Sequence, residues 1–331
     1  MWRWSHRKEV CILSYRSAAA DATGRLAAPE SERRLAEIGV LGVMVIWAAN
    51  FIVVKGALRE LPPIGFTSIR FLLASLVLLA ICRMREGSIA IPRRDLLALA
   101  LLGAVGFGIY QPLWTVGLSQ TSAGESALLL AATPMFTLLI AAAIGSDQLT
   151  RSRLAGACVS FVGVGLVVVS AAGGLGGHLV GNIITLCAAA LWAAYVAFGA
   201  PVLRRHSPLR TTAWAVFFGT LMMLPFGVWQ LSTVAWGNVS WVSALAVVYA
   251  GLGSIALGNV IQFRAVKVIG PARTTGFQFL VPALTVVLAG IFLGEQVRPE
   301  QIAGGIVIVL GIVMARRATT VRGRPAVAAG A

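Results

Sequence analysis

Charged residues are scarce in this chain of 331 residues. Asp, Glu, Lys and Arg make up 12% of the sequence, whereas 58% of it belongs to the hydrophobic set. A soluble domain keeps roughly a quarter of its residues charged, because its surface faces water. This composition excludes an ordinary soluble domain and predicts an all-α integral membrane protein whose main partner is the lipid bilayer.

The residues that build metal sites and disulfides are also few. The chain has four cysteines without metal spacing, and we expect no disulfide framework. Its three histidines, His6, His178 and His206, fall in expected tails or loops, with no partner at ligand spacing. We therefore expect no metal, no cofactor and no membrane-embedded enzyme. No Gly-rich stretch is followed by Lys-Ser or Lys-Thr, which argues against ATP-driven transport.

Apolar runs of near-spanning length recur along the sequence. A helix needs roughly 17–25 mostly apolar residues to cross the hydrocarbon core. Ten such runs are separated by charge clusters or by Pro and Gly. They cover residues 38–57, 66–82, 96–118, 122–145, 153–172, 180–203, 211–231, 241–263, 272–293 and 299–315.

The distribution of basic residues gives these spans an orientation. Acidic residues number 12 against 27 Lys and Arg. In a soluble protein this excess suggests nucleic acid, but cytoplasmic loops of membrane proteins collect Lys and Arg. With ten spans and a cytoplasmic N-terminus, 23 basic residues fall on the inner side and only Lys55, Arg59 and Arg298 on the outer side. We expect no nucleic-acid partner, a multi-pass inner-membrane location, and cytoplasmic polar tails at 1–37 (basic and disordered) and 316–331.

The chain also contains a weak internal repeat. Residues 101–166 align with 249–314 at an offset of 148, with 9 identities in 66 positions, eight of them between Pro134 and Gly163. Upstream, IWAAN at 46–50 matches LWAAY at 191–195 at an offset of 145. The pattern predicts two five-helix units, 38–172 and 180–315. Because five is odd, the second unit enters the membrane in the opposite orientation, which is typical of transporters.

These motifs resemble the drug/metabolite transporter superfamily, in its EamA-type ten-helix branch. The resemblance rests on IWAANFIVVKGAL, on FTSIRF with Arg70, and on a mid-span proline followed by an acidic residue in each half. The first half departs from the usual Gly-Glu, since it has Gly145-Ser146-Asp147 where the second has Gly294-Glu295. The resemblance covers about residues 38–315 and implies a carrier or exporter of amino acids or other small metabolites.

Ionisable residues within spans are candidates for function because they are costly in lipid. Arg70 either pairs with a carboxylate of the substrate or of a gating partner, or snorkels near the outer interface. Glu125 either titrates and couples transport to protons, or is a helix N-terminal residue favoured by the macrodipole. Both alternatives remain open for each residue.

Polar and aromatic side chains deeper in the spans are candidates for the wall of a substrate cavity. Interhelical hydrogen bonding and core packing are the alternative roles. Pro134 and Pro282 interrupt two spans and predict bends, either static or used in gating. The cavity candidates, with Arg70, are Trp47, Asn50, Tyr110, Gln111, Trp114, Trp192, Tyr195, Asn259 and Gln262.

The sequence favours a secondary transporter that moves a small-molecule substrate by alternating access. The substrate is expected to be an amino acid or a related compound, with export one direction and proton coupling one energy source. A channel or membrane sensor is the alternative. The oligomeric state is left open.

Overall fold

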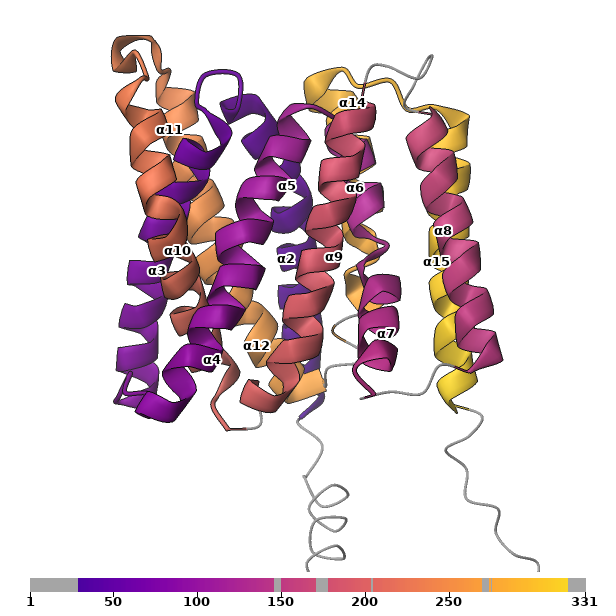
Figure 1. Cartoon of the computed structure of the whole chain (residues 1–331), viewed down its shortest axis with the longest axis horizontal. Coiled ribbons are helices and arrows are strands. Elements are labelled where there is room, and N and C mark those ends of the chain that lie inside the picture. The colour runs from indigo at the N-terminus through magenta and orange to yellow at the C-terminus, as the bar shows by residue number, and fades with distance from the viewer. Residues whose placement is uncertain are drawn as a thin grey trace, which may run out of the picture.

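The computed structural model describes residues 29–145, 150–170, 178–203, 205–269, 274 and 276–320, and within these ranges it contains helices and no strand (Figure 1). Eight helices are long and apolar enough to cross a membrane, and two shorter apolar helices, Leu280–Leu293 and Pro299–Ala315, follow them. The elements are α2 (Glu30–Ala57), α3 (Pro63–Glu86), α4 (Arg93–Gly103), η1 (Ala104–Ile109), α5 (Tyr110–Ser119), α6 (Ala123–Leu130), α7 (Thr133–Ala143), α8 (Arg151–Ser170), α9 (Leu179–Leu203), α10 (Pro208–Ser232), η2 (Trp236–Asn238), α11 (Trp241–Val248), η3 (Tyr249–Leu257), α12 (Gly258–Ile269), α14 (Leu280–Leu293) and α15 (Pro299–Thr320).

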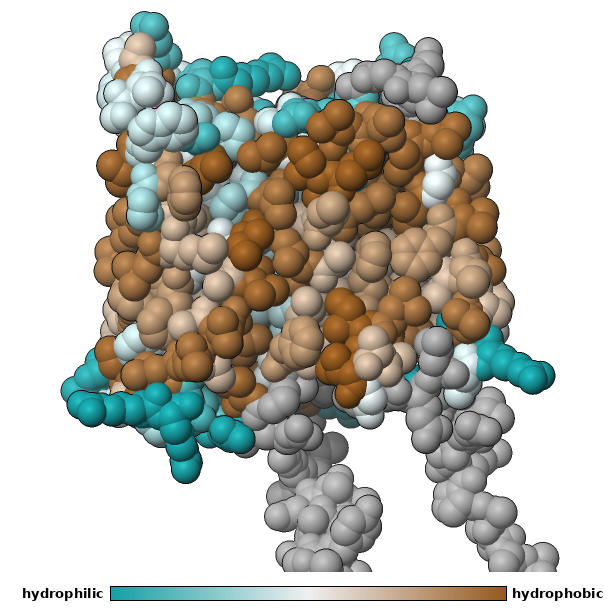
Figure 2. All heavy atoms as spheres, viewed as in Figure 1, coloured by the Kyte–Doolittle hydropathy of each residue, from teal (hydrophilic) through white to brown (hydrophobic). Residues whose placement is uncertain are grey.

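The outer surface of this helical assembly is apolar around its middle. Figure 2 shows a broad hydrophobic belt with hydrophilic side chains gathered at the two ends. Large side chains such as Phe226, Phe292 and Val162 are more than half exposed on it. Lipid offers no hydrogen bonds to the backbone, so helices that satisfy their own peptide groups are the structures able to span it. The chain is therefore a multi-pass integral membrane protein.

The spans match the predicted runs, with corrections at their ends. α2 begins at Glu30 rather than at 38, so residues 30–37 belong to the first helix and not to a disordered tail. Pro29 occupies its N-cap position, and Glu30 and Glu32 in the first turn interact favourably with the helix dipole. α3 begins at Pro63, a residue suited to a first helical turn. We call the end where α2 begins and α15 finishes the inner end, and the opposite end the outer end (Figure 1).

Four of the spans are irregular at matching places. The third and eighth contain the π-helical segments η1 and η3, whose wider turns often mark functional sites. The fourth breaks between α6 and α7, just before Pro134. A turn at 278–279 likewise precedes α14, which has Pro282 in its first turn. A proline in the first helical turn removes no intrahelical bond, so both prolines lie where a new helical segment starts.

α8 and α15 pack through glycines. A Cβ atom on Gly156 would lie 2.5 Å from the Gly311 carbonyl oxygen, and one on Gly163 would lie 2.6 Å from the Gly304 carbonyl oxygen. The contacts run in opposite directions along the two helices, so the helices are antiparallel. Small residues permit this close approach, which stabilises helix pairs in lipid.

α3 and α10 are joined at both ends by polar contacts. At the outer end, the Gln230 amide oxygen accepts hydrogen bonds of 3.0 Å from the backbone N–H groups of Ile64 and Gly65. At the inner end, Glu86 accepts a hydrogen bond from Ser207 and forms a 3.0 Å ion pair with Arg210. Gln230 thus satisfies N–H groups that the first turn of α3 leaves unpaired, whereas Glu86 contacts side chains at the start of α10.

The glycine contacts generate a stability prediction with an internal control. Gly163→Leu should destabilise the protein by about 1–3 kcal/mol through overpacking, because its side chain would collide with the backbone of α15. Gly165→Leu should have little effect, because nothing lies within 4 Å of the position of its Cβ. Thermal unfolding of the detergent-purified variants measures the difference. Equal melting temperatures for the two variants would contradict the packing described here.

Candidate functional site

An aromatic cluster joins the third span to α9 in the interior. The Trp192 ring stacks on Tyr195, with 4.8 Å between ring centroids, and lies 5.1 Å from Tyr110 and 6.0 Å from Phe107. Gly106, in η1, leaves space for the Tyr195 ring, since a Cβ on Gly106 would lie 2.3 Å from that ring. We call Phe107, Tyr110, Trp192 and Tyr195 the aromatic cluster. It brings together three of the predicted cavity residues.

Arg70 lies beside this cluster and is almost fully buried, at 1% exposure. Its Nη2 donates a 2.8 Å hydrogen bond to the Gln111 amide oxygen. Its guanidinium carbon lies 5.4, 5.1 and 5.3 Å from the rings of Phe66, Phe71 and Trp114. We call these five residues the Arg70 site. The burial corrects the snorkelling alternative, because the side chain does not reach the interface.

Trp47 and Asn50 lie on α2 and face the second half of the chain differently. The Trp47 indole N–H donates a 3.0 Å hydrogen bond to the Ser254 carbonyl oxygen in η3. Gly258 permits this approach, since a Cβ there would lie 2.8 Å from the Trp47 nitrogen. At the repeat offset, Gly258 corresponds to Tyr110, on which Trp192 packs. The matched tryptophans therefore have different neighbours. The Asn50 side-chain oxygen is buried without a hydrogen-bond partner.

The two polar candidates on α12 are not joined to the aromatic cluster by any contact that the structure describes. The Asn259 amide donates a 2.6 Å hydrogen bond to the Ile255 carbonyl oxygen of its own turn. The Gln262 amide oxygen is buried and unpartnered. α12 packs against α2, where a Cβ on Gly39 would lie 3.1 Å from Ile261. Gln262 therefore lies on a helix that packs against α2, at a level nearer the inner end than Trp47.

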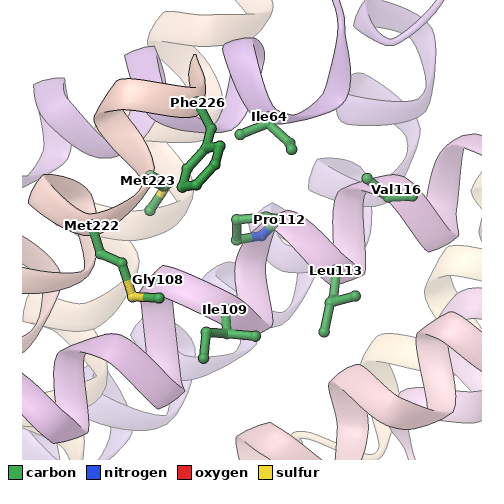
Figure 3. A pocket seen from close by; sticks show the side chains of 9 residues that line it. All are labelled: Ile64, Gly108, Ile109, Pro112, Leu113, Val116, Met222, Met223 and Phe226. Carbon is green, nitrogen blue, oxygen red and sulfur yellow. The ribbon is translucent and has the colours of Figure 1, made fainter. Parts of the chain in front are cut away.

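Neither of the two pockets that the structure describes contains a predicted cavity residue. The first, about 280 Å³, is an apolar crevice between α3, α5 and α10 (Figure 3), where the Phe226 and Met223 side chains face Ile64 and Pro112. The second lies at the outer end, between the loops that follow α2 and α10. The predicted cavity residues are a mixture of buried side chains and partly buried ones such as Trp47, Gln111 and Asn259. Their role in a cavity wall stays a prediction.

Glu125 lies in the first turn of α6 and connects three helices near the outer end. Its carboxylate accepts hydrogen bonds of 2.8 Å from both Thr121 and Gln301, the latter on α15. The His178 ring nitrogen lies 3.1 Å from it, just before α9. The sequence placed His178 in a loop, and no pattern indicated its contact with Glu125. We call Glu125, Thr121, His178 and Gln301 the outer network.

A second carboxylate strengthens the outer end. Glu295, just after α14, accepts hydrogen bonds of 2.7 Å from the Ala123 N–H and 3.1 Å from the Gly124 N–H, and so caps α6. The Lys55 ammonium donates to the carbonyl oxygens of Leu118, Ser119 and Thr121, near the end of α5. The doubled Gly-acid motif singled out Glu295, but no sequence pattern indicated Lys55. Asp147, its expected counterpart, lies outside the described residues.

At the inner end, Asp95 is buried and accepts hydrogen bonds of 3.0 Å from both Arg205 and His206. No sequence pattern indicated this contact of His206. These contacts join the start of α4 to the loop before α10. Within the ranges that the structure covers, no three His, Cys, Asp or Glu side chains come together in a way that could hold a metal ion.

Comparisons with known proteins agree with this architecture. The model of the EamA-like transporter family matches the chain twice, at residues 34–169 and 179–317. A probable terminal-alkyne amino-acid exporter of Streptantibioticus cattleyicolor is 31% identical over 86% of this chain and 94% of its own length. A probable amino-acid metabolite efflux pump of Salmonella typhimurium is 27% identical over 82% and 91%.

A solved crystal structure shares the fold, with a TM-score of 0.60 and 17% identity over 88% of this chain and all of the other. Two matches of one family model cover most of the chain, and they fall on the ten helical spans described above. The chain therefore belongs to the EamA-like transporter family.

Proposed function

We propose that this protein is a secondary carrier that works by alternating access, and not a channel, a sensor or an enzyme. In this proposal, residues 38–172 and 180–315 are inverted five-helix repeats, and the Arg70 site and aromatic cluster lie between them. Their relative movement exposes these residues first to one side of the membrane and then to the other.

The exchange of contacts between the halves is the observation that carries this proposal. The offset of 148 converts Gly156 into Gly304 and Gly163 into Gly311. The contact between Gly156 and Gly311 thereby becomes the contact between Gly304 and Gly163, and the structure has both. This is the behaviour expected of two copies of one unit around a two-fold axis.

The substrate is proposed to be an amino acid or a related small metabolite, and the direction export. The printed names of the two relatives, an amino-acid exporter and an amino-acid metabolite efflux pump, support this. An inner-membrane location with cytoplasmic termini is supported by Arg83, Arg85, Arg93 and Arg94, which are exposed at the inner end. Figure 2 shows hydrophilic side chains gathered at that end.

In the proposed cycle, the hydrogen bonds at the outer end break when the substrate site opens to the outer side of the membrane. Glu295 and Gln301 belong to the second half, whereas α6 and Glu125 belong to the first, so their hydrogen bonds join the halves. We propose that separation of these contacts opens the site outward.

A cross-link across the outer end tests alternating access. In a variant whose Cys11, Cys82, Cys158 and Cys187 are replaced by Ala, Gly124→Cys and Glu295→Cys are introduced together. A Cβ on Gly124 would lie 3.6 Å from the carboxylate oxygen of Glu295. Because a cysteine side chain is shorter than that of glutamate, the two thiols are joined with a short bis-methanethiosulfonate reagent, which forms a disulfide with each of them. The probe is the amino acid that most raises the melting temperature of the purified protein.

The cross-link should abolish saturable uptake of that amino acid by proteoliposomes, and reduction should restore it, whereas Gly124→Cys alone should be insensitive to the reagent. Undiminished transport by the cross-linked protein would contradict alternating access. Non-saturating flux at channel rates would favour a channel.

Substitution of candidate residues on α2 and α12 tests the location of the substrate site. Trp47→Ala and Gln262→Ala should each lower kcat/KM for transport by about tenfold or more, equivalent to about 1.4 kcal/mol, without loss of membrane insertion. Trp229→Ala is the matched control, because Trp229 is 69% exposed on the lipid-facing surface. Initial rates in proteoliposomes at equal protein density provide the measurement. If both substitutions leave kcat/KM unchanged, Trp47 and Gln262 are not part of the site.

Glu125 allows a test of proton coupling. If its carboxylate carries the coupled proton, Glu125→Gln should exchange substrate across the membrane but fail to accumulate it when a pH gradient is the sole driving force. Uptake is compared with and without the imposed gradient. Accumulation by Glu125→Gln equal to that of the unmodified protein would assign the residue a structural role in the outer network.

A further inference from the structure

Arg70 is a buried cation without a counter-ion. No carboxylate in the described part of the chain lies within ion-pair distance of Arg70. The ion pairs recorded there are formed by other arginines and by histidines. An arginine keeps its proton in proteins, so burial does not remove the charge. A buried charge is costly unless an opposite charge and hydrogen bonds compensate for it. The fold holds this charge in place without neutralising it.

The donors around this charge are incompletely used. Gln111 accepts one bond from Nη2, whereas the Arg70 Nε is buried without a partner. The Trp114 indole N–H, whose ring lies 5.3 Å from the guanidinium, is also buried and unpartnered. Two orphaned donors beside one uncompensated cation are an arrangement that accepts a carboxylate. Arginine is well suited to this, since its planar fork can donate two parallel hydrogen bonds.

Ring contacts explain only part of the stabilisation of Arg70. Phe66, Phe71 and Trp114 surround the guanidinium at distances suitable for cation–π attraction. They offer no acceptor for the Nε proton. The backbone of α3 at Arg70 lies close to η3, because a Cβ on Gly251 would lie 2.7 Å from the Arg70 carbonyl oxygen. α3 is therefore packed closely against η3 at Arg70, and the unused Nε donor of Arg70 lies in the interior.

We propose that Arg70 binds the carboxylate of the transported molecule, with Trp114 donating a further hydrogen bond and the surrounding rings contacting an apolar body. The substrate class is small organic carboxylates with an apolar side chain, zwitterionic amino acids included. Organic cations without a carboxylate are excluded, because a fixed buried cation repels them. This inference rests on the proposed transport function and specifies which chemical group the site recognises.

The test compares ligands that differ only in the carboxylate. Purified protein is presented with a free amino acid, its amide and its methyl ester, and binding is followed by thermal stabilisation in detergent and by uptake into proteoliposomes. The unmodified protein should bind the free acid at least about tenfold more tightly than the amide or ester, because a charge-assisted pair is lost. Arg70→Gln should lose this preference, and Arg70→Lys should retain part of it.

The variants also separate binding from folding. Arg70→Gln should elute as a monodisperse species with a melting temperature no lower than that of the unmodified protein, because it removes an uncompensated charge. If the unmodified protein transports the acid, amide and ester equally, the carboxylate assignment is overturned while the carrier stands. If Arg70→Gln retains the preference for the free acid, Arg70 is not the anion-binding residue. If no amino acid or derivative shows saturable uptake, the proposed transport function itself fails.

Discussion

Close approach of backbones through glycine is the interaction on which the rest of this structure depends. Lipid tails are as apolar as leucine side chains, so burial of apolar surface does not bring helices together within a bilayer. Contact at Gly156 and Gly163 brings α8 against α15. A Cβ on Gly103 would lie 2.4 Å from the backbone carbonyl oxygen of a neighbouring helix, and one on Gly251 would lie 2.7 Å from another. Polar groups then act at the helix ends, where Gln230 satisfies unpaired N–H groups of α3 and Glu86 forms an ion pair with Arg210. The middle of the assembly is thereby left to aromatic packing and to Arg70.

The spans therefore fall into two groups, uninterrupted helices and helices with irregular segments. The fifth and tenth spans are uninterrupted helices in glycine contact, and they make a suitable fixed frame. The third, fourth, eighth and ninth contain π-helical segments or breaks, and these irregularities lie beside the candidate site. Discontinuous helices at the substrate site are typical of secondary carriers. The outer network and the Glu295 cap connect these broken spans, so their hydrogen bonds are well placed to control opening.

Much of the fold follows from the sequence, because lipid imposes a length and a composition that can be recognised along the chain. The spans, the glycines and the two prolines were all marked by such patterns. The partners of charged groups were not. His178 and Glu125 are 53 residues apart, and His206 and Asp95 are 111 apart. No periodicity connects residues that meet only through packing of helices. The cavity role of the polar and aromatic candidates stays a prediction, because sequence polarity does not distinguish a cavity wall from interhelical packing.

The repeat also shows why the site is not symmetrical. Offsets of 145 and 148 make Ala215 the counterpart of Arg70, and Gln262 the counterpart of Trp114. The same close approach recurs at both places, since Gly103 meets the carbonyl oxygen of Ala215 as Gly251 meets that of Arg70. Only one of them carries a cation. In the proposed carrier, symmetry is retained where helices would exchange environments during the transport cycle, and it is lost where a ligand with two different ends would be held. A single arginine on the pseudo-two-fold arrangement gives the site a direction, and the substrate's carboxylate would define which end of the molecule occupies the first half.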